Sequence, residues 1–206
     1  MSQKIKVWDI LVRIFHWSLV VAFITSYVSG EESSDLHIYS GYIILILILV
    51  RCVWGFIGSK YARFSNFVFN RHVVYMYLKS LLSAQPIHYT GHNPAGGWMV
   101  VALLISLFFT TISGLQLYAV EENAGPFSSI NTEIQFISTA YADSDVHKSQ
   151  GENDDEEFWE EIHEFFANFT LLLILIHIAG VFVSGKLHNE NLVKAMIKGY
   201  KETDHN

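Results

Sequence analysis

Four histidines lie inside or at the ends of long apolar segments, where a polar side chain is costly. They are His16, His37, His163 and His177. Ionisable residues in such segments usually have a function. A neutral imidazole is a common nitrogen ligand for metals, and two imidazoles on facing helices can bind one metal from opposite sides. A single such histidine could equally be a hydrogen-bonded packing residue.

The segments that carry these histidines are long enough to cross a bilayer, which takes about 20 mostly apolar residues. With 51% hydrophobic and 16% charged residues, the chain has the composition of a membrane protein. Four spans are expected, at about residues 10–28, 38–57, 98–120 and 165–183. The expected fold is all-α: one integral membrane four-helix bundle over residues 1–206.

The positions of the histidines within the spans pair them by depth. At about 1.5 Å per residue, His16 lies roughly 9 Å and His177 roughly 12 Å from one membrane face. His37 and His163 both lie near the opposite face. A b-type haem takes two axial ligands on opposite sides of a flat macrocycle. Two histidine pairs at two depths therefore fit two stacked b haems and favour ligation over four unrelated packing histidines.

The sequence lacks the motifs of several competing kinds of chemistry. Cys52 is the only cysteine, so the sequence has no disulfide framework, CxxCH attachment or iron–sulfur motif. It has no Walker loop or zinc motif, and nucleic acid is not an expected partner. The first apolar segment contains Arg13 and His16 and is too long for a signal peptide, so it is expected to remain in the mature protein.

Positive charge is concentrated on one side of the expected bundle. Of thirteen Lys and Arg residues, only Lys148 falls on the other side. The positive-inside rule therefore predicts that both termini are cytoplasmic, in a multi-pass protein in contact with membrane lipid. Residues 67–82 mix apolar and basic side chains and predict an amphipathic helix on the cytoplasmic surface.

The opposite side is acidic. Residues 121–157 carry ten acidic residues and one lysine. This outer loop fits two interpretations: a docking surface for a basic electron carrier close to His163, or a solvated connection.

Two further groups of residues also have two interpretations. Arg13 and Arg51, near the cytoplasmic boundary, fit either pairing with haem propionates or snorkelling that sets topology. The glycines within the spans fit either a close approach of the macrocycle or close helix packing. These glycines are Gly41, Gly55, Gly114 and Gly180.

At these residues the sequence resembles the bacterial di-haem cytochrome b family, which includes cytochrome b561 proteins and membrane subunits of nickel–iron hydrogenase, formate dehydrogenase and thiosulfate reductase. The resemblance runs nearly end to end, and it implies a place in the bacterial cytoplasmic (inner) membrane. Its motifs are Trp8-Asp9-x-x-x-Arg13-x-x-His16-Trp17, His37-x-x-x-Gly41-Tyr42, Arg51-x-x-Trp54-Gly55-Phe56-x-Gly58-Ser59-x-Tyr61-x-Arg63-Phe64, Gly91-His92-Asn93-Pro94-Ala95-Gly96-Gly97, His163-Glu164, His177 and His188-x-Glu190-Asn191-Leu192-x-x-Ala195-Met196.

The resemblance implies that His16 and His177 ligate an inner haem and that His37 and His163 ligate an outer one. It also implies a quinone near the inner haem, against the turn that contains Asn93 and Gly96. Glycines there allow close backbone approach, and His92 or Asn93 can hydrogen-bond a quinone carbonyl. The alternative is a Pro-Gly turn that only starts the third span.

The leading functional interpretation is electron transfer across the membrane between a quinone pool and a periplasmic redox protein such as a c-type cytochrome. One alternative is a cytochrome b subunit of a hydrogenase-like or other oxidoreductase complex. Another is a superoxide:quinone oxidoreductase, although the negative outer side would repel a superoxide anion. A haem-free scaffold or transporter would leave the four histidines unexplained.

Overall fold

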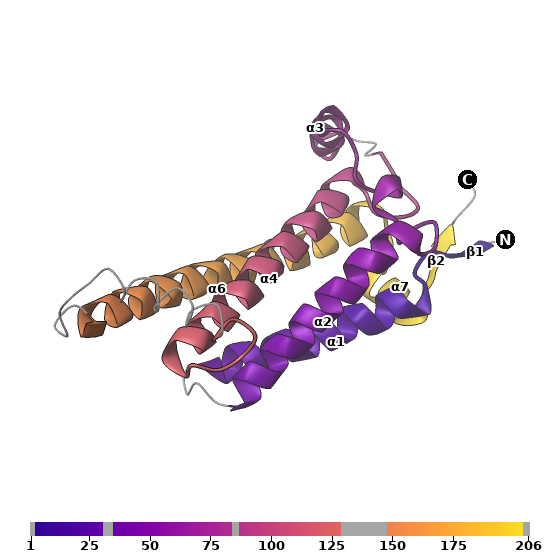
Figure 1. Cartoon of the computed structure of the whole chain (residues 1–206). Coiled ribbons are helices and arrows are strands. Elements are labelled where there is room, and N and C mark those ends of the chain that lie inside the picture. The colour runs from indigo at the N-terminus through magenta and orange to yellow at the C-terminus, as the bar shows by residue number, and fades with distance from the viewer. Residues whose placement is uncertain (1–2, 31–34, 84–86, 129–147, 204–206) are drawn as a thin grey trace. The chain divides into compact units, whose positions relative to one another are not determined.

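The computed structural model describes residues 3–30, 35–83, 87–128 and 148–203 (Figure 1). They form two compact units. The first comprises Met1–Leu104 and Leu171–Asn206, and the second Ile105–Thr170. The expectation of a single domain over the whole chain stays a prediction. The described elements are β1 (Gln3–Lys6), α1 (Ile10–Val28), α2 (Asp35–Ile57), η2 (Phe64–Asn66), α3 (Arg71–Ser80), α4 (Pro94–Glu121), α6 (Lys148–Leu187), α7 (Leu192–Lys198) and β2 (Tyr200–Thr203).

The four expected spans all appear as helices that are long and apolar enough to cross a membrane, which confirms the all-α membrane class. They are Ile10–Val28, Asp35–Ile57, Pro94–Glu121 and Asp155–Leu187. The last three are longer than expected, because counting apolar residues misses polar turns that continue a helix into water. The 40 residues of α6 extend about 60 Å, roughly twice the hydrocarbon thickness of a bilayer.

Apolar side chains cover the outside of α1 and α2, which lie side by side in Figure 1. On α1, Ile14 is 60% exposed and Val21 65% exposed, and on α2 Ile46 is 59% exposed. A soluble surface rarely carries so much contiguous apolar area. These faces suit lipid, and the chain is a multi-pass membrane protein.

The two ends of the chain are joined by a small sheet that the sequence did not predict. β1 and β2 pair antiparallel, with Lys4 opposite Glu202 (Figure 1). Just before β2, Gly199 ends α7 with a left-handed φ of 86°. Its carbonyl accepts hydrogen bonds from the backbone N–H groups of Val7 at 2.9 Å and Trp8 at 3.1 Å. Both ends of the chain are therefore fixed to the start of α1.

The amphipathic segment contains α3, whose N-cap is Asn70: the Asn70 side chain accepts from the His72 backbone N–H at 3.1 Å. Tyr77 is its buried residue. The helix expected within residues 67–82 is confirmed, and its place on the cytoplasmic surface stays a prediction.

Asp9 connects three segments at the start of α1. Its Oδ1 accepts from the Val12 backbone N–H at 2.8 Å and so caps the helix. Its Oδ2 accepts from Trp54 Nε1 of α2 at 3.0 Å and from the hydroxyl of Ser59. Burial raises the pKa of Asp9, but the hydrogen bonds from Ser59, Val12 and Trp54 together hold it below the usual 3.8.

We expect Asp9→Ala to lower the free energy of unfolding by about 1–2 kcal/mol at pH 7, since an N-cap and its two tertiary partners are lost together. Because the pKa is lowered on folding, this stabilisation is complete above pH 4 and disappears as the pH falls through the folded pKa of Asp9. Denaturation in detergent micelles, followed by circular dichroism, measures both effects. Asp9→Asn is the control that keeps a capping side chain without the charge. Equal stability of wild type and Asp9→Ala at pH 7 would contradict the expectation.

Candidate functional site

His16 on α1 and His177 on α6 face each other within the first unit. Their ring centroids are 6.5 Å apart, and the ring planes are inclined by 52°. A metal–imidazole bond is about 2 Å long and the nitrogen lies about 1 Å from its ring centroid, so two axial imidazoles have centroids roughly 6 Å apart. The two rings therefore fit the opposite axial positions of one haem iron.

The surroundings of His16 also fit a bound group. Its Nδ1 is buried and has no hydrogen-bond partner among the described residues. Leaving a polar group buried and unpaired is costly. An unpaired imidazole nitrogen in such a place is available to a bound group.

His37 lies in the first turn of α2, and its Nδ1 is 2.8 Å from the backbone carbonyl of Ser26 in the last turn of α1. A carbonyl oxygen can only accept, so Nδ1 carries the proton. Nε2 then carries the lone pair. This is the tautomer of a metal-ligating histidine, which normally donates its other N–H to a carbonyl or carboxylate.

His163 has the same arrangement inside the second unit. Its Nδ1 lies 3.0 Å from the backbone carbonyl of Thr110 on α4 and 3.3 Å from the hydroxyl of Ser113. Its proton is therefore also on Nδ1, and Nε2 carries the lone pair. His37 and His163 belong to different units, and their pairing stays a prediction.

The surroundings of the span glycines differ. A Cβ on Gly114 would lie 2.8 Å from Cε1 of His163, so this glycine makes room for the imidazole. A Cβ on Gly55 would overlap the ring of Phe64, which is close packing. A Cβ on Gly41 or Gly180 would meet no described atom of a neighbouring segment within 4 Å, and for these two glycines both interpretations stay open.

Arg51 is buried and packs on aromatic rings. It is 2% exposed, donates to the Ala62 carbonyl at 3.1 Å and lies 5.1 Å from the centroid of the Phe64 ring and 5.7 Å from that of Phe67. This is not the position of a snorkelling side chain. Its Nη1 is buried and has no partner within the described part of the chain.

Arg13, on α1, donates from Nη2 to the carbonyl of Ile197 on α7. Its Nε is buried, again without a partner among the residues that the structure describes. Both arginines therefore have a structural contact and an unused donor, and pairing with haem propionates stays a prediction.

The turn before α4 has a clear structural role. The Asn93 Oδ1 accepts from the Gly96 backbone N–H at 2.7 Å, which caps α4, and Pro94 starts the helix. Asn93 Nδ2 also donates to the Ser184 hydroxyl at 3.4 Å. A Cβ on Gly97 would overlap the Phe67 carbonyl. The Pro-Gly turn is thus accounted for by helix initiation and packing, and the quinone role of Asn93 and Gly96 stays a prediction.

His92 is the neighbouring side chain that spacing alone did not assign. Its ring packs between Trp8, at a centroid distance of 4.6 Å, and Phe67, at 4.5 Å. Its Nδ1 is buried and unpartnered within the described residues. Burial, assisted by the charges of Arg51 and Lys201, lowers the pKa of His92 to about 3, so the ring is neutral at physiological pH. Its place in a glycine-rich turn was the only sequence signal.

A second titratable cluster at the same end was not predicted. Glu190 accepts from His88 Nε2 at 2.9 Å and from Lys201 Nζ at 2.8 Å. Burial raises the pKa of Glu190, but these two partners outweigh it and hold the pKa below its usual value. The cluster ties the 87–92 segment and β2 to the residues after α6. No sequence pattern could indicate it, because the partners are far apart along the chain.

Part of the acidic outer loop is described. Glu156 and Glu160 of α6 lie close enough to Glu121, at the end of α4, for their charges to interact. Glu160 precedes His163 by one helical turn. Residues 129–147 of the loop lie outside the described part of the chain.

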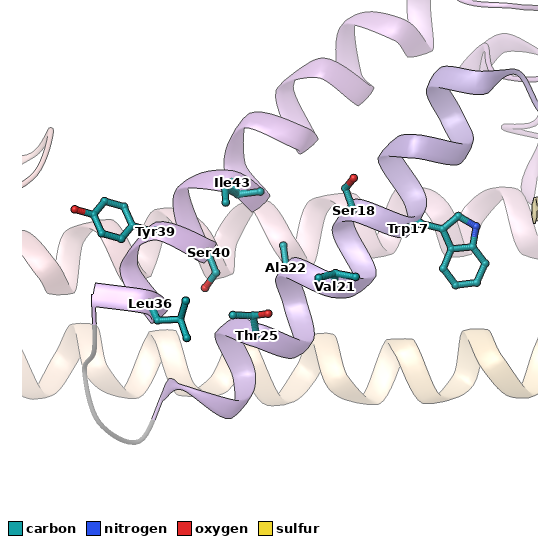
Figure 2. Close-up of a pocket in the computed structure, with 9 residues that line it drawn as sticks. All are labelled: Trp17, Ser18, Val21, Ala22, Thr25, Leu36, Tyr39, Ser40 and Ile43. Atoms are coloured by element: carbon teal, nitrogen blue, oxygen red, sulfur yellow. The ribbon is translucent and has the colours of Figure 1, made fainter.

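A groove of about 490 Å³ runs along α1 and α2. Figure 2 shows side chains from both helices along it, with Trp17 at one end and Tyr39 at the other. Its lining is apolar apart from small hydroxyl groups and the Tyr39 phenol, and it contains none of the predicted ligands. The lining residues are Trp17, Ser18, Val21, Ala22, Thr25, Leu36, Tyr39, Ser40 and Ile43.

Comparison with known proteins identifies the family of the chain. Residues 7–199 match the model of the family described as prokaryotic cytochrome b561. A probable Ni/Fe-hydrogenase B-type cytochrome subunit of Rhizobium leguminosarum bv. viciae is 25% identical, with 96% of this chain and 88% of the relative aligned.

Two further relatives carry a closely similar description. The subunit of Azotobacter vinelandii is 24% identical over 97% of this chain and 89% of its own length, and the hydrogenase 1 subunit of Escherichia coli K12 is 21% identical over 95% and 89%. No solved structure matches the chain at a comparable significance. Because the family match includes all four histidines and nearly every described element, the chain belongs to the prokaryotic cytochrome b561 family and is a membrane cytochrome b of electron transfer.

Proposed function

We propose that this chain holds two b haems and transfers electrons across the membrane between a quinone and a redox partner at its acidic side. The observation that carries the proposal is the 6.5 Å separation of the His16 and His177 rings, which fits two axial ligands of one iron. The haems supply reversible one-electron chemistry, while the chain supplies their position and surroundings.

The second haem is assigned to His37 and His163. Both donate Nδ1–H to a backbone carbonyl, at 2.8 Å and 3.0 Å, so Nε2 is the nitrogen of each ring that would bind iron. The unused donor atoms of Arg13 and Arg51 are assigned to haem propionates, since a guanidinium binds carboxylates well.

Both termini are assigned to the cytoplasm. The β1–β2 pairing places the two ends of the chain together. Twelve of the thirteen Lys and Arg residues lie in or next to the termini and the connection between the second and third spans, and such residues are retained on the cytoplasmic side.

The proposed partner is an oxidoreductase complex, because the relatives above are described as cytochrome subunits of Ni/Fe-hydrogenases. A periplasmic electron carrier such as a c-type cytochrome is the other candidate. Exposed acids around Glu156 and Glu160 favour a partner with a basic surface in either case. They also disfavour superoxide as the substrate, because an anion would be repelled.

The quinone is assigned to the cytoplasmic end, beside His92, Asn93 and Gly96. The buried Nδ1 of His92 can bond a quinone carbonyl as a donor in one tautomer. Asn93 can offer its Nδ2–H, because Oδ1 is engaged in capping α4.

We expect His16→Ala and His177→Ala each to remove the same haem, and His37→Ala and His163→Ala each to remove the other. Haem quantification and a redox titration of the purified protein, followed at the reduced b-type α band, measure the losses. The wild type should bind two haems. If His16→Ala and His37→Ala gave identical spectral losses, the pairing would be wrong, and a wild type with one haem would refute the di-haem assignment.

His92→Phe is expected to slow haem reduction by a soluble short-chain quinol at least about tenfold, since an oriented hydrogen bond to the quinone is lost while the aromatic packing is kept. Asn93→Asp removes the Nδ2 donor and keeps the helix cap, so it should slow the reaction as well. Stopped-flow spectroscopy measures the rates, and both haem spectra should stay intact. His72→Phe, on α3, is the control. Unchanged rates in both test variants would place the quinone elsewhere.

We expect electron transfer to a basic c-type cytochrome to slow steeply between 0.01 M and 0.1 M salt, where the Debye length falls from about 30 Å to about 10 Å. Neutralising Asp155, Glu156, Glu157 and Glu160 together should flatten that dependence without changing either haem spectrum. Asp35→Asn, at the start of α2, should leave it nearly unchanged. An electron-transfer rate that changes neither with salt nor with the fourfold neutralisation would leave the acidic surface without a docking role.

A further inference from the structure

Three hydroxyl groups join α4 to α6 inside the second unit. Oγ1 of Thr170 on α6 lies 2.7 Å from Oγ of Ser106 and 3.2 Å from Oγ1 of Thr110, both on α4. Thr110 Oγ1 also lies 2.9 Å from the backbone carbonyl of Ser106. Thr170 is 0% exposed and Ser106 2% exposed, so water does not replace these bonds. Ser106, Thr110 and Thr170 are called the hydroxyl clamp below.

Each hydroxyl has one proton, and this fixes the direction of the bonds. The Ser106 carbonyl can only accept, so Thr110 donates to it. Thr170 must then donate to Thr110, and Ser106 must donate to Thr170. The clamp is a closed ring in which each hydroxyl donates once, and Thr170 takes part in both bonds between the helices.

Thr110 belongs both to the clamp and to the surroundings of His163. Its side chain accepts from Thr170, and its carbonyl accepts from Nδ1 of His163 at 3.0 Å. His163 precedes Thr170 by seven residues, which is close to two turns and about 10 Å along α6. One face of α6 therefore contacts α4 at two polar points that share one residue.

The contacts between these two points are less directional. Phe166 of α6 stacks on Phe109 of α4 at a centroid distance of 5.1 Å, and a stacked apolar pair can slide. In a bilayer the hydrophobic effect does not hold helices together, so interhelical hydrogen bonds have more influence on their register. A shift of α6 along its axis would withdraw His163 from the Thr110 carbonyl.

We propose that Thr170 is a positioning residue for His163: the hydroxyl clamp fixes the register of α6 against α4 in which the imidazole meets the Thr110 carbonyl. This inference rests on the proposed function, because it treats His163 as a haem ligand. The partner that orients a ligating histidine sets its tautomer, ring orientation and basicity, and losing such a partner weakens metal binding about 10- to 100-fold.

The test compares three variants in the full-length, haem-loaded protein. Thr170→Val keeps the shape of the side chain and removes the hydroxyl, and Thr170→Ser keeps the hydroxyl. Thr111→Val is the matched control, since the Thr111 hydroxyl is also buried on α4 but bonds within its own helix to the Phe108 carbonyl at 2.9 Å. His163→Ala first identifies which low-spin ferric signal in the electron paramagnetic resonance spectrum belongs to this haem.

We expect Thr170→Val to shift that signal and to speed transfer of that haem to excess apo-globin about tenfold, while the other haem is unaffected. Thr170→Ser should restore both properties, and Thr111→Val should resemble the wild type. If Thr170→Val does not accumulate, Ser106→Ala removes one bond of the clamp and carries the same test.

An unchanged signal and transfer rate in Thr170→Val would overturn the inference, as would an equal change in Thr111→Val. Two bound haems in His163→Ala would refute the proposed ligand set, and this inference with it. Loss of one haem in His163→Ala, together with an unchanged Thr170→Val, would refute the clamp alone and leave the proposed function standing.

Discussion

An imidazole that offers one nitrogen to a metal must keep its proton on the other, and inside a membrane that proton needs an acceptor. The chain provides this acceptor from the backbone. Ser26 gives its carbonyl to His37, and Thr110 gives its carbonyl to His163. A carbonyl in the last turn of α1 has no partner within the helix, so it can accept at little cost. Gly114 beside the His163 ring leaves room for the second of these bonds.

His16 and His177 differ from His37 and His163 in their hydrogen bonding. His16 and His177 face each other at the separation of axial ligands, but the Nδ1 of His16 has no acceptor among the described residues. Nearby, His92 and Arg51 also have buried nitrogens without described partners. At the same end of the molecule, several donors thus have no acceptor among the described residues, while the carboxylates of Asp9 and Glu190 have hydrogen-bond partners of their own. These donors are available to polar groups of a bound cofactor.

The sequence was sufficient for properties that depend on residues close together in the chain. Apolar segment length predicted the four spans, and the mixture of apolar and basic residues in 67–82 predicted the helix α3. Contacts between residues far apart in the chain could not be predicted from the sequence. The β1–β2 pairing, the bonds of Asp9 to Trp54 and Ser59, and the Glu190 cluster all join segments that no local pattern connects. Backbone acceptors such as the Thr110 carbonyl have no signature in a sequence, because every residue has one.

The same limit applies to the glycines. In the sequence, Gly55 and Gly114 are equivalent by type and by location within a span. Only the structure distinguishes them, because Gly55 lies against the Phe64 ring and Gly114 against the His163 ring. The expected spans were too short for a related reason. Hydropathy indicates where a helix leaves the hydrocarbon layer, whereas backbone hydrogen bonding decides where the helix ends. α6 therefore begins well before its apolar part.

The pairing of β1 with β2 has a consequence for biosynthesis. Val7 and Trp8 are bonded to the Gly199 carbonyl, and Ala195 is in their hydrophobic cluster. These contacts cannot form until Gly199 has left the ribosome. Contacts between such distant segments are slow to form because a long loop must first be closed. The end of the molecule that holds β1, β2 and the His16–His177 pair is thus completed later than the α1–α2 hairpin, which can form while synthesis continues. If that pair binds a haem as proposed, insertion of the haem would be a late step in maturation.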